Sequence, residues 1–275
     1  MSDITMTGSG TAGEQPSLAL AGPFTVSRTE HASNTSLALH SHPNATITIV
    51  LGGGYNETLG GVTHRLPPMS VVVKPPHTPH ANRVDARGAR CLLLELSADG
   101  VDSINPVAGV FETPRVAHLV RGGGLALKTL AVLEQRVNEP KMLALESLTM
   151  ELTALIGIET GALSTKEPAA WLKRVRERLE ESSTEITLGD LAKEAGCHPI
   201  HLTRMFRRAY GESIGSYARN VRLTKVTRAI ASARGDTLSR SAMSNGYYDH
   251  SHLSHDFLTR TGMTPAEWRD LASKS

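Results

Sequence analysis

The C-terminal part of this chain contains two copies of one pattern, about fifty positions apart. In each copy a leucine, an alanine and a glycine are followed by a second leucine, a phenylalanine and a second glycine. The residues are Leu188, Ala192, Gly196, Leu202, Phe206 and Gly211 in the first copy, and Leu238, Ala242, Gly246, Leu253, Phe257 and Gly262 in the second. The first three pairs are 50 residues apart and the last three are 51 apart, so one residue is inserted after the second turn. Each copy predicts a short helix, a glycine turn and a second helix.

A helix pair of this kind places its second helix in the major groove of DNA, so the tandem copies predict a DNA-binding unit. In the first copy, Thr187 is expected to cap the first helix, and Leu202 and Phe206 are expected to face inward. Residues outside the core are candidates for DNA contact, with those near the helix start reaching base edges and the later arginines reaching phosphates. These candidates are His198, Pro199, Ile200, His201, Thr203, Arg204, Arg207 and Arg208.

The second copy presents different outward side chains. Its candidates for DNA contact are Asp249, His250, Ser251, Ser254 and His255. Between the copies, residues 213–233 predict one long helix with cations at three-residue steps, among them Arg222, Lys225 and Arg228. This row either faces the DNA backbone or forms a solvated basic face. A rigid connecting helix would hold the two second helices roughly 34 Å apart, which is one turn of DNA.

The charge distribution indicates a nucleic-acid partner for the C-terminal half only. The net charge is +2, but residues 168–275 hold 17 lysines and arginines against 12 acidic residues, whereas residues 1–167 hold 12 against 15. Cys91 and Cys197 form no metal-type spacing and indicate a reducing compartment. Because the sequence has neither a signal-peptide pattern nor an apolar run long enough to span a membrane, we expect a cytoplasmic protein without a membrane partner.

The N-terminal half predicts strands first and helices afterwards. Apolar runs such as 46–51, 71–74 and 91–96 are separated by glycine and proline turns, which predicts a small sandwich or barrel. Further on, leucines at 145, 148, 152 and 155 form a helical seam that either packs on its own barrel or pairs two chains. The predicted organisation is a disordered tail (1–16), a barrel (17–104), a helical dimerisation segment (105–160), a linker (161–169) and a DNA-binding unit (170–275).

The C-terminal half resembles the DNA-binding domain of AraC-type (arabinose-regulator-like) transcription factors. The resemblance covers about Trp171 to Asp270 and rests on the two spacings together with a characteristic ending. The residues that carry it are Ala192, Gly196, Leu202, Phe206, Gly211, Gly246, Tyr247, Ser251, Leu253, Ser254, Phe257, Gly262, Met263, Thr264, Pro265, Trp268 and Arg269. The resemblance implies base contacts by Ile200, Thr203 and Arg204 in the first copy, and by His250, Ser251 and His255 in the second.

The N-terminal half resembles the cupin barrel that precedes this domain in many such regulators, over about Leu39 to Leu96. Metal-binding cupins present His-x-His, a glutamate and a later histidine. His40, His42 and His80 fill the histidine places, but the glutamate would fall at Thr46 or Ile47. Three imidazoles can still bind zinc or a late transition metal. Because the carboxylate is missing, we expect instead that the histidines and Tyr55 line a ligand pocket, and we expect no cofactor.

Together these features predict a multidomain α+β protein: an N-terminal cupin-like β-barrel with trailing helices, then an all-α domain with two helix-turn-helix units. We interpret it as an effector-responsive transcription regulator, an activator and homodimer, not an enzyme. Its expected partners are double-stranded DNA, a small molecule and RNA polymerase. One alternative is a cupin dioxygenase or isomerase fused to a DNA-binding domain, for which Glu57 is the nearest acid–base candidate. Another is a barrel that only dimerises.

The second copy departs from the family where His255 often has an arginine counterpart, and Asp256 adds a negative charge beside it. A histidine is mostly neutral at about pH 7.5 and contacts guanine or phosphate more weakly than arginine does. We therefore expect Arg204→Ala to weaken operator binding more than His255→Ala, as measured by gel shift on one duplex. The opposite order would refute this ranking of the two copies.

Overall fold

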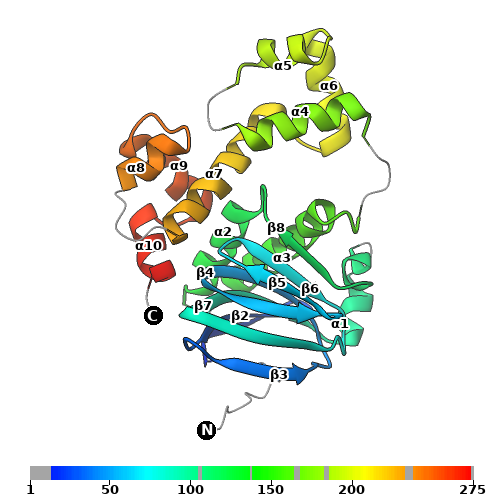
Figure 1. Cartoon of the computed structure of the whole chain (residues 1–275), viewed down its shortest axis with the longest axis vertical. Helices are drawn as coiled ribbons and strands as arrows, with labels where there is room; N and C mark the ends of the chain where they lie inside the picture. The colour runs from blue at the N-terminus through cyan, green and yellow to red at the C-terminus, as the bar shows by residue number, and fades with distance from the viewer. Residues whose placement is uncertain are drawn as a thin grey trace.

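The computed structural model describes residues 14–104, 107–136, 138–163, 168–182, 186–232 and 238–273. An antiparallel sheet with three α-helices forms the N-terminal unit (14–163), and helices alone form the C-terminal unit (168–273), so the fold is mixed α+β as predicted (Figure 1). The strands are β1 (Glu14–Ala21), β2 (Phe24–His31), β3 (Ser36–His40), β4 (Ala45–Leu59), β5 (Val62–Leu66), β6 (Ser70–Lys74), β7 (His80–Leu96) and β8 (Arg115–His118). The helices are α1 (Ala98–Ser103), α2 (Gly123–Leu133), α3 (Glu139–Glu159), α4 (Ala170–Glu181), α5 (Leu188–Glu194), α6 (Pro199–Tyr210), α7 (Ile214–Ser232), α8 (Leu238–Ser244), α9 (His250–Thr261) and α10 (Pro265–Ser273), with a short 3-10 turn η1 (Ala108–Phe111).

Two long strands, β4 and β7, organise the sheet. They pair with each other from Ala45–Leu96 to Leu59–His80, and the register shifts where β4 passes Gly52 and Gly53. Gly53 has φ +66°, and a Cβ there would lie 2.0 Å from the Gly88 carbonyl oxygen, so only glycine fits this crossing. On one side of the bend, β4 pairs with β6 and β7 pairs with β2. On the other side, β4 pairs with β5 and β7 pairs with β3.

The prediction of a β-barrel is wrong in one respect, because the sheet does not close. The hydrogen-bonded path runs β1-β2-β7-β4-β6-β8, with β3 and β5 attached at the sides, so among the described strands its two ends stay unpaired with each other. The sheet folds over at the glycine bend instead of closing, because β4 and β7 each serve both halves. Strand β1 begins at residue 14, so its first three residues (14–16) fall within the segment predicted to be a disordered tail. The rest of that segment (1–13) and residues 164–167 of the predicted linker lie outside the described residues.

The leucine seam packs inside the N-terminal unit. Asn138 caps α3 through its side chain, with Pro140 in the first turn, where proline costs no hydrogen bond. Leu145 and Leu152 are fully buried in the core between the sheet and α2, and Leu148 is 8% exposed. Of the two interpretations of this seam, packing on its own sheet is therefore the observed one, and these leucines are not available to pair two chains.

The C-terminal unit contains two helix pairs joined by α7. In the first pair, Thr187 caps α5 as predicted, and Gly196 takes φ +65° in the turn before α6. This pair has its own core, in which Leu202 and Phe206 are fully buried. The second pair, α8 and α9, shares instead the core of the N-terminal unit through residues such as Phe257. The two helix pairs are therefore attached to the sheet unit in different ways.

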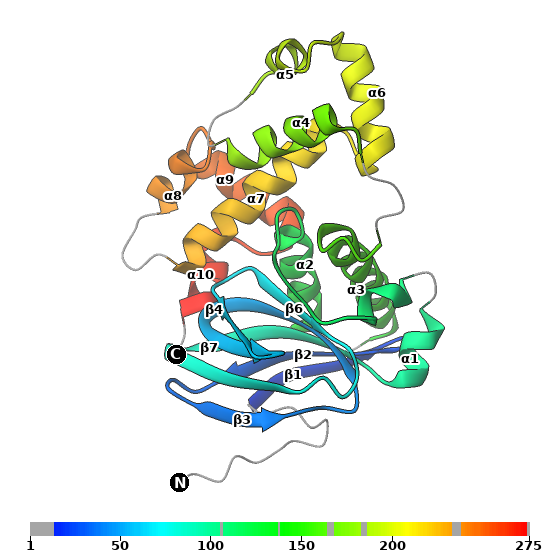
Figure 2. The same ribbon diagram turned by 45° about the vertical axis from the view of Figure 1, so that its right-hand side comes forward.

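The end of α10 docks directly on the β4–β7 bend, beside which it lies in both views (Figures 1 and 2). Arg90 of β7 donates a hydrogen bond to the backbone oxygen of Ala272. A Cβ added to Gly52 would lie 2.4 Å from the same oxygen, so the absence of a side chain permits this contact. Among the described residues, no helix is long and apolar enough to cross a membrane.

This close approach makes Gly52→Ala a test of the docking. We expect the substitution to lower the free energy of unfolding by about 1–3 kcal/mol, because the added methyl group meets backbone and not a flexible side chain. Urea unfolding monitored by circular dichroism measures the change. The matched control is Gly189→Ala inside α5, where the nearest atom to the new Cβ is 3.6 Å away. There we expect unchanged or slightly higher stability, and equal losses in both variants would contradict the docking described.

Candidate functional site

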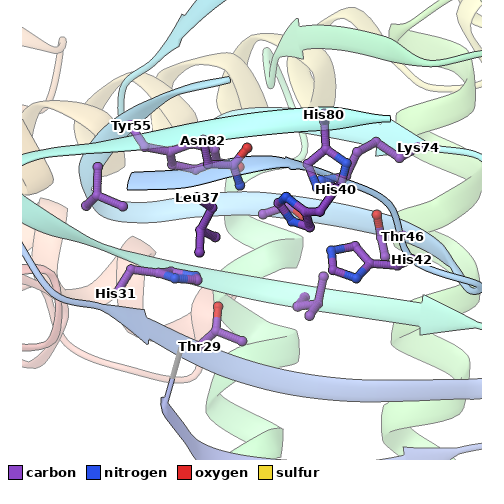
Figure 3. A pocket seen from close by; sticks show the side chains of 13 residues that line it. Thr29, His31, Leu37, His40, His42, Thr46, Tyr55, Lys74, His80 and Asn82 are labelled. Carbon is purple, nitrogen blue, oxygen red and sulfur yellow. The ribbon is translucent and has the colours of Figure 1, made fainter. Parts of the chain in front are cut away.

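A pocket lies between the two halves of the folded sheet (Figure 3). All four residues predicted for a ligand pocket, His40, His42, Tyr55 and His80, line it together. The sequence did not single out the other lining residues, which are Thr29, His31, Leu37, Thr46, Thr48, Lys74, Asn82, Val84 and Leu93. They come from β2, β3, β4, β6 and β7, so the pairing of these strands, and not any local motif, creates the pocket.

Three histidines meet at one end of this pocket. Their ring centroids are 4.9 Å apart for His40–His42, 4.3 Å for His40–His80 and 5.1 Å for His42–His80. Burial, with Lys74 nearby, lowers the pKa of His80 to about 3, so this imidazole is neutral. The turn residue His77 is exposed, and its backbone N–H donates to the His42 carbonyl at 2.7 Å, which ties the two histidine segments together.

Glu57 forms a buried ion pair and not a free acid–base group. Its Oε1 lies 2.7 Å from Lys74 Nζ, and its Oε2 accepts a hydrogen bond from the Tyr55 hydroxyl at 3.4 Å. Burial first, and then the Glu57 charge, raises the pKa of Tyr55 above its usual value. Lys74 and Glu57 are 17 residues apart in sequence, and Lys74 pairs with Thr46 at the other end of β4, so the folding of the sheet and not a local motif brings the two side chains together.

Several buried polar atoms on the pocket side of the sheet have no hydrogen-bond partner. They include Ser27 Oγ, Thr46 Oγ1, His80 Nε2 and both carboxylate oxygens of Glu95. Glu95 stands directly opposite Thr46 across the β4–β7 pairing and is 1% exposed. Burial raises the pKa of Glu95 to about 7. Unpaired buried polar groups cost stability, and they concentrate at sites that bind something.

The first helix pair presents most of its predicted DNA contacts to solvent. Ile200 is 71% exposed, and Arg204, Arg207 and Arg208 are also exposed along α6. Other candidates have structural roles as well. His198 caps α6 by accepting from the Ile200 N–H, Pro199 opens the helix, Thr203 donates to the Pro199 carbonyl at 3.0 Å, and His201 stacks on Trp171 with centroids 6.0 Å apart.

In the second pair, Asp249 is the N-cap of α9 and accepts from the His252 N–H at 2.7 Å. His250, Ser251 and His255 are exposed, and Ser254 is half-buried. The sequence suggested that Asp256 adds an uncompensated negative charge beside His255, but the structure shows otherwise. It pairs with Arg260 at 2.6 Å and accepts from the Tyr247 hydroxyl at 3.1 Å, so its charge is compensated within the protein.

The cations of α7 contact the protein itself. Lys225 donates to the Ser182 carbonyl at 2.8 Å, and Arg228 donates to the Leu119 carbonyl at 3.1 Å. The Arg222 guanidinium lies 5.7 Å from the centre of the Tyr247 ring. The structure thus adds a third use for this row to the two that the sequence left open, namely contacts that join α7 to its neighbours.

Sequence reasoning missed a charged junction at Arg121. This side chain is buried and contacts Glu159 of α3 at 3.5 Å and Glu212, just before α7, at 2.5 Å. Its guanidinium also lies 4.8 Å from the centre of the Tyr217 ring on α7. Glu159 in turn accepts from the backbone N–H groups of Val120 and Arg121. Arg121 therefore connects the two units, and no local pattern could have revealed it because its partners are distant in sequence.

Comparison with known proteins places a family domain in the C-terminal unit. Residues 191–270 match the family described as a helix-turn-helix domain. Over 82 residues the chain is 30% identical to the HTH-type transcriptional regulator Rv1931c of Mycobacterium tuberculosis, covering 30% of this chain and 31% of that protein. Over 87 residues it is 32% identical to the HTH-type transcriptional activator RhaR of Escherichia coli K12, covering 32% of this chain and 30% of RhaR.

These curated relatives are thus matched over less than a third of their length. Among solved structures, ToxT of Vibrio cholerae aligns over 92% of this chain and 100% of its own, with 8% identity and a TM-score of 0.38. A TM-score of this size does not establish a shared overall fold. The similarity that carries weight is therefore the one to helix-turn-helix regulators in the C-terminal unit.

The buried carboxyl of Glu95 predicts a pH-dependent stability. Since the folded chain keeps this proton up to about pH 7, against 4.5 for an ordinary glutamate, stability falls as pH rises through that window. We expect Glu95→Gln to be more stable than the parent by up to about 3 kcal/mol near pH 8, and equally stable near pH 4. Urea unfolding at the two pH values measures this. The exposed Glu151→Gln on α3 is the control, and a shift of similar size there would contradict the assignment.

Proposed function

We propose that this chain, whose residues 191–270 match a helix-turn-helix domain family, is a sequence-specific DNA-binding transcription regulator of the AraC type. The observation that carries the proposal is that domain, together with its similarity to two proteins named as transcriptional regulators. The exposed arginines of α6 give this surface the charge that DNA phosphates require.

In this proposal both helix pairs read DNA. Ile200, Thr203 and Arg204 of α6 contact bases in one major groove, while Arg207 and Arg208 further along the helix neutralise phosphates. On α9, His250, Ser251 and His255 contact bases in the next groove, while Asp249 chiefly holds the helix start. Lys225, Arg228 and Arg222 of α7 chiefly join that helix to its neighbours in the protein, and phosphate contact is a secondary role for them.

We propose further that the pocket of the N-terminal unit binds a small-molecule effector. The pocket strands β4 and β7 also hold α10, and Arg121 holds α7, so occupancy of the pocket and presentation of α6 and α9 are physically connected. An effector can shift the presentation only by binding the two arrangements unequally. The arrangement favoured by the effector then binds DNA with changed affinity.

The proposed role in transcription also bears on the other functions and partners that the sequence suggested. A fused cupin enzyme is disfavoured because Glu57, its nearest acid–base candidate, is paired with Lys74. Pairing of two chains on repeated half-sites remains part of the proposal, but it must use a surface other than the buried leucine seam of α3. Contact with RNA polymerase and a cytoplasmic location follow from the proposed role.

Selection of duplexes from a random pool by the full-length chain tests this proposal. We expect enrichment of two half-sites whose centres are about 10 base pairs apart, because α6 and α9 would enter successive grooves. A pool that stays random after selection at low salt would refute DNA reading.

The salt dependence of binding to the selected duplex locates the phosphate contacts. We expect affinity to fall steeply with salt, and Arg207→Gln to reduce the slope of log K against log salt by about one. The matched control is Arg136→Gln, which removes one charge from an exposed position of the N-terminal unit. Equal slopes for Arg207→Gln and the parent would exclude the phosphate contact.

A further inference from the structure

A groove runs along α7 in the C-terminal unit, separate from the pocket of the sheet. Helix α7 forms its floor and lies between the two helix pairs in both views (Figures 1 and 2). The end of α4, the start of α5 and α6 form one wall, and the end of α8 with α9 forms the other. The groove has a volume of about 610 Å³, within the range of roughly 300–1,000 Å³ that small-molecule sites occupy.

The charged groups that line this groove are basic. Arg219, Arg222 and Lys225 follow one another at three-residue steps along α7, and none of the described lining residues is acidic. The charges of Glu180 and Glu181 on α4 act on Lys225, but neither of these residues lines the groove. A cavity lined by charges of one sign attracts ligands of the opposite sign. Charge complementarity therefore indicates an anionic occupant.

The start of α7 and the ring of His252 add donors that also suit an anion. Ser213 accepts a hydrogen bond from the Ser216 N–H at 3.2 Å, and the first turn of this 19-residue helix reaches the groove at Gly215. His252 Nδ1 accepts from the Tyr248 N–H at 3.3 Å, so a neutral ring carries its hydrogen on Nε2. The N-terminal end of a helix is partly positive and favours anionic groups.

The same groove has an apolar side. Leu179, Ile186 and Leu188 line it next to the first helix pair, and Ile214 and Val221 line it on α7. Leu188 is 41% exposed, so part of this apolar surface meets water. Covering such a surface with an apolar group is favourable, whereas a phosphate group alone gains nothing from it. The occupant that fits both sides therefore carries an apolar body beside its charged group.

Gly215 keeps space in the groove that the packing of the protein does not use. A glycine inside a helix is less stable than an alanine. Apart from the backbone of its own helix, a Cβ at this position would meet only the guanidinium end of Arg219, 3.5 Å away, and the φ angle is not in the left-handed region. Neither a close approach nor a turn thus requires the glycine, and its missing side chain leaves room beside Arg219.

We infer that this groove binds a small organic anion with a single carboxylate, sulfonate or phosphate group on an apolar body. The charged group lies against Arg219 and Arg222, and the apolar body lies against Leu188 and Ile214. Thr203, a proposed base contact of α6, lines the same groove, so an occupied groove would compete with DNA. That competition rests on the proposed function, whereas the binding of the anion does not.

The test titrates the full-length chain, without DNA, with anilinonaphthalene sulfonate, whose fluorescence rises when its rings leave water. We expect saturable binding, and roughly tenfold weaker binding of the uncharged analogue phenylnaphthylamine. Arg219→Gln and Arg222→Gln should each weaken binding of the sulfonate about three- to tenfold, because each removes a charged contact. The matched control is Lys193→Gln, which removes an exposed charge of α5 outside the groove and should bind as the parent does.

A steric variant locates the probe without a change of charge. Gly215→Leu places a side chain in the groove and should weaken binding of the sulfonate roughly tenfold, while the helix itself becomes more stable. Gly189→Leu adds the same side chain at an exposed position of α5 that does not line the groove, so it should leave binding unchanged. Circular dichroism checks that each variant folds, and if Gly215→Leu does not, the exposed Arg219→Gln decides the question.

Two results would overturn the inference: no saturable binding of the sulfonate by the parent, or the same affinity in the parent, Arg219→Gln and Gly215→Leu. A random duplex identifies DNA phosphate as the other source of negative charge. If Arg219→Gln weakens binding of that duplex while the parent takes up no sulfonate, the groove serves DNA alone and the inference fails. A chain that binds the sulfonate but selects no DNA refutes the regulator alone.

Discussion

The pairing of β4 with β7 is the constraint on which the rest of the molecule depends. These strands of 15 and 17 residues turn together at Gly53 and Gly88, where a side chain would collide with backbone. One face of the pair lines the pocket, and the other packs in the core against α2 and α3. At the bend the same strands hold the end of α10 through Arg90. A displacement on the pocket face therefore cannot stay local, because the strands that would move are those that position the C-terminal helices.

The two helix pairs are attached to the sheet unit in different ways, so a displacement of the sheet affects them differently. The α8–α9 pair shares the core of the sheet unit, so it must follow that unit as a rigid attachment. The α5–α6 pair has a separate core and is connected through α7 and through Arg121, whose contacts with Glu159 and Glu212 are ionic. Ionic contacts depend on geometry more sharply than apolar packing does. The first pair is thus the one whose position the proposed effector would change at lower cost.

What the sequence could predict follows from local periodicity. The glycine turns, the Thr187 cap, the strand runs and the histidines of the pocket are all signalled within a few residues of each other, and the structure has them. The closed barrel and the pairing seam could not be decided that way, since an apolar stripe looks the same whether it meets its own sheet or a second chain. For the same reason the sequence left Arg228 and Lys225 open between the DNA backbone and solvent, and took Asp256 as an added negative charge beside His255. Their partners, Leu119, Ser182 and Arg260, are set by tertiary packing, except in the last case, where the i+4 spacing of Asp256 and Arg260 was a visible signal.

The polar groups buried on the pocket side of the sheet make the fold less stable than an apolar surface would. Strands buried on both faces usually carry aliphatic side chains on both, and β7 does so on its core face with Leu92 and Leu94. On the other face Glu95, Thr46 and His80 are buried with polar atoms that have no hydrogen-bond partner, and each such atom costs free energy. A ligand that supplied the missing partners would recover this cost, so the proposed effector would couple binding to folding at this face. In the proposed regulator, that coupling would let a small effector change the conformational balance of a much larger chain.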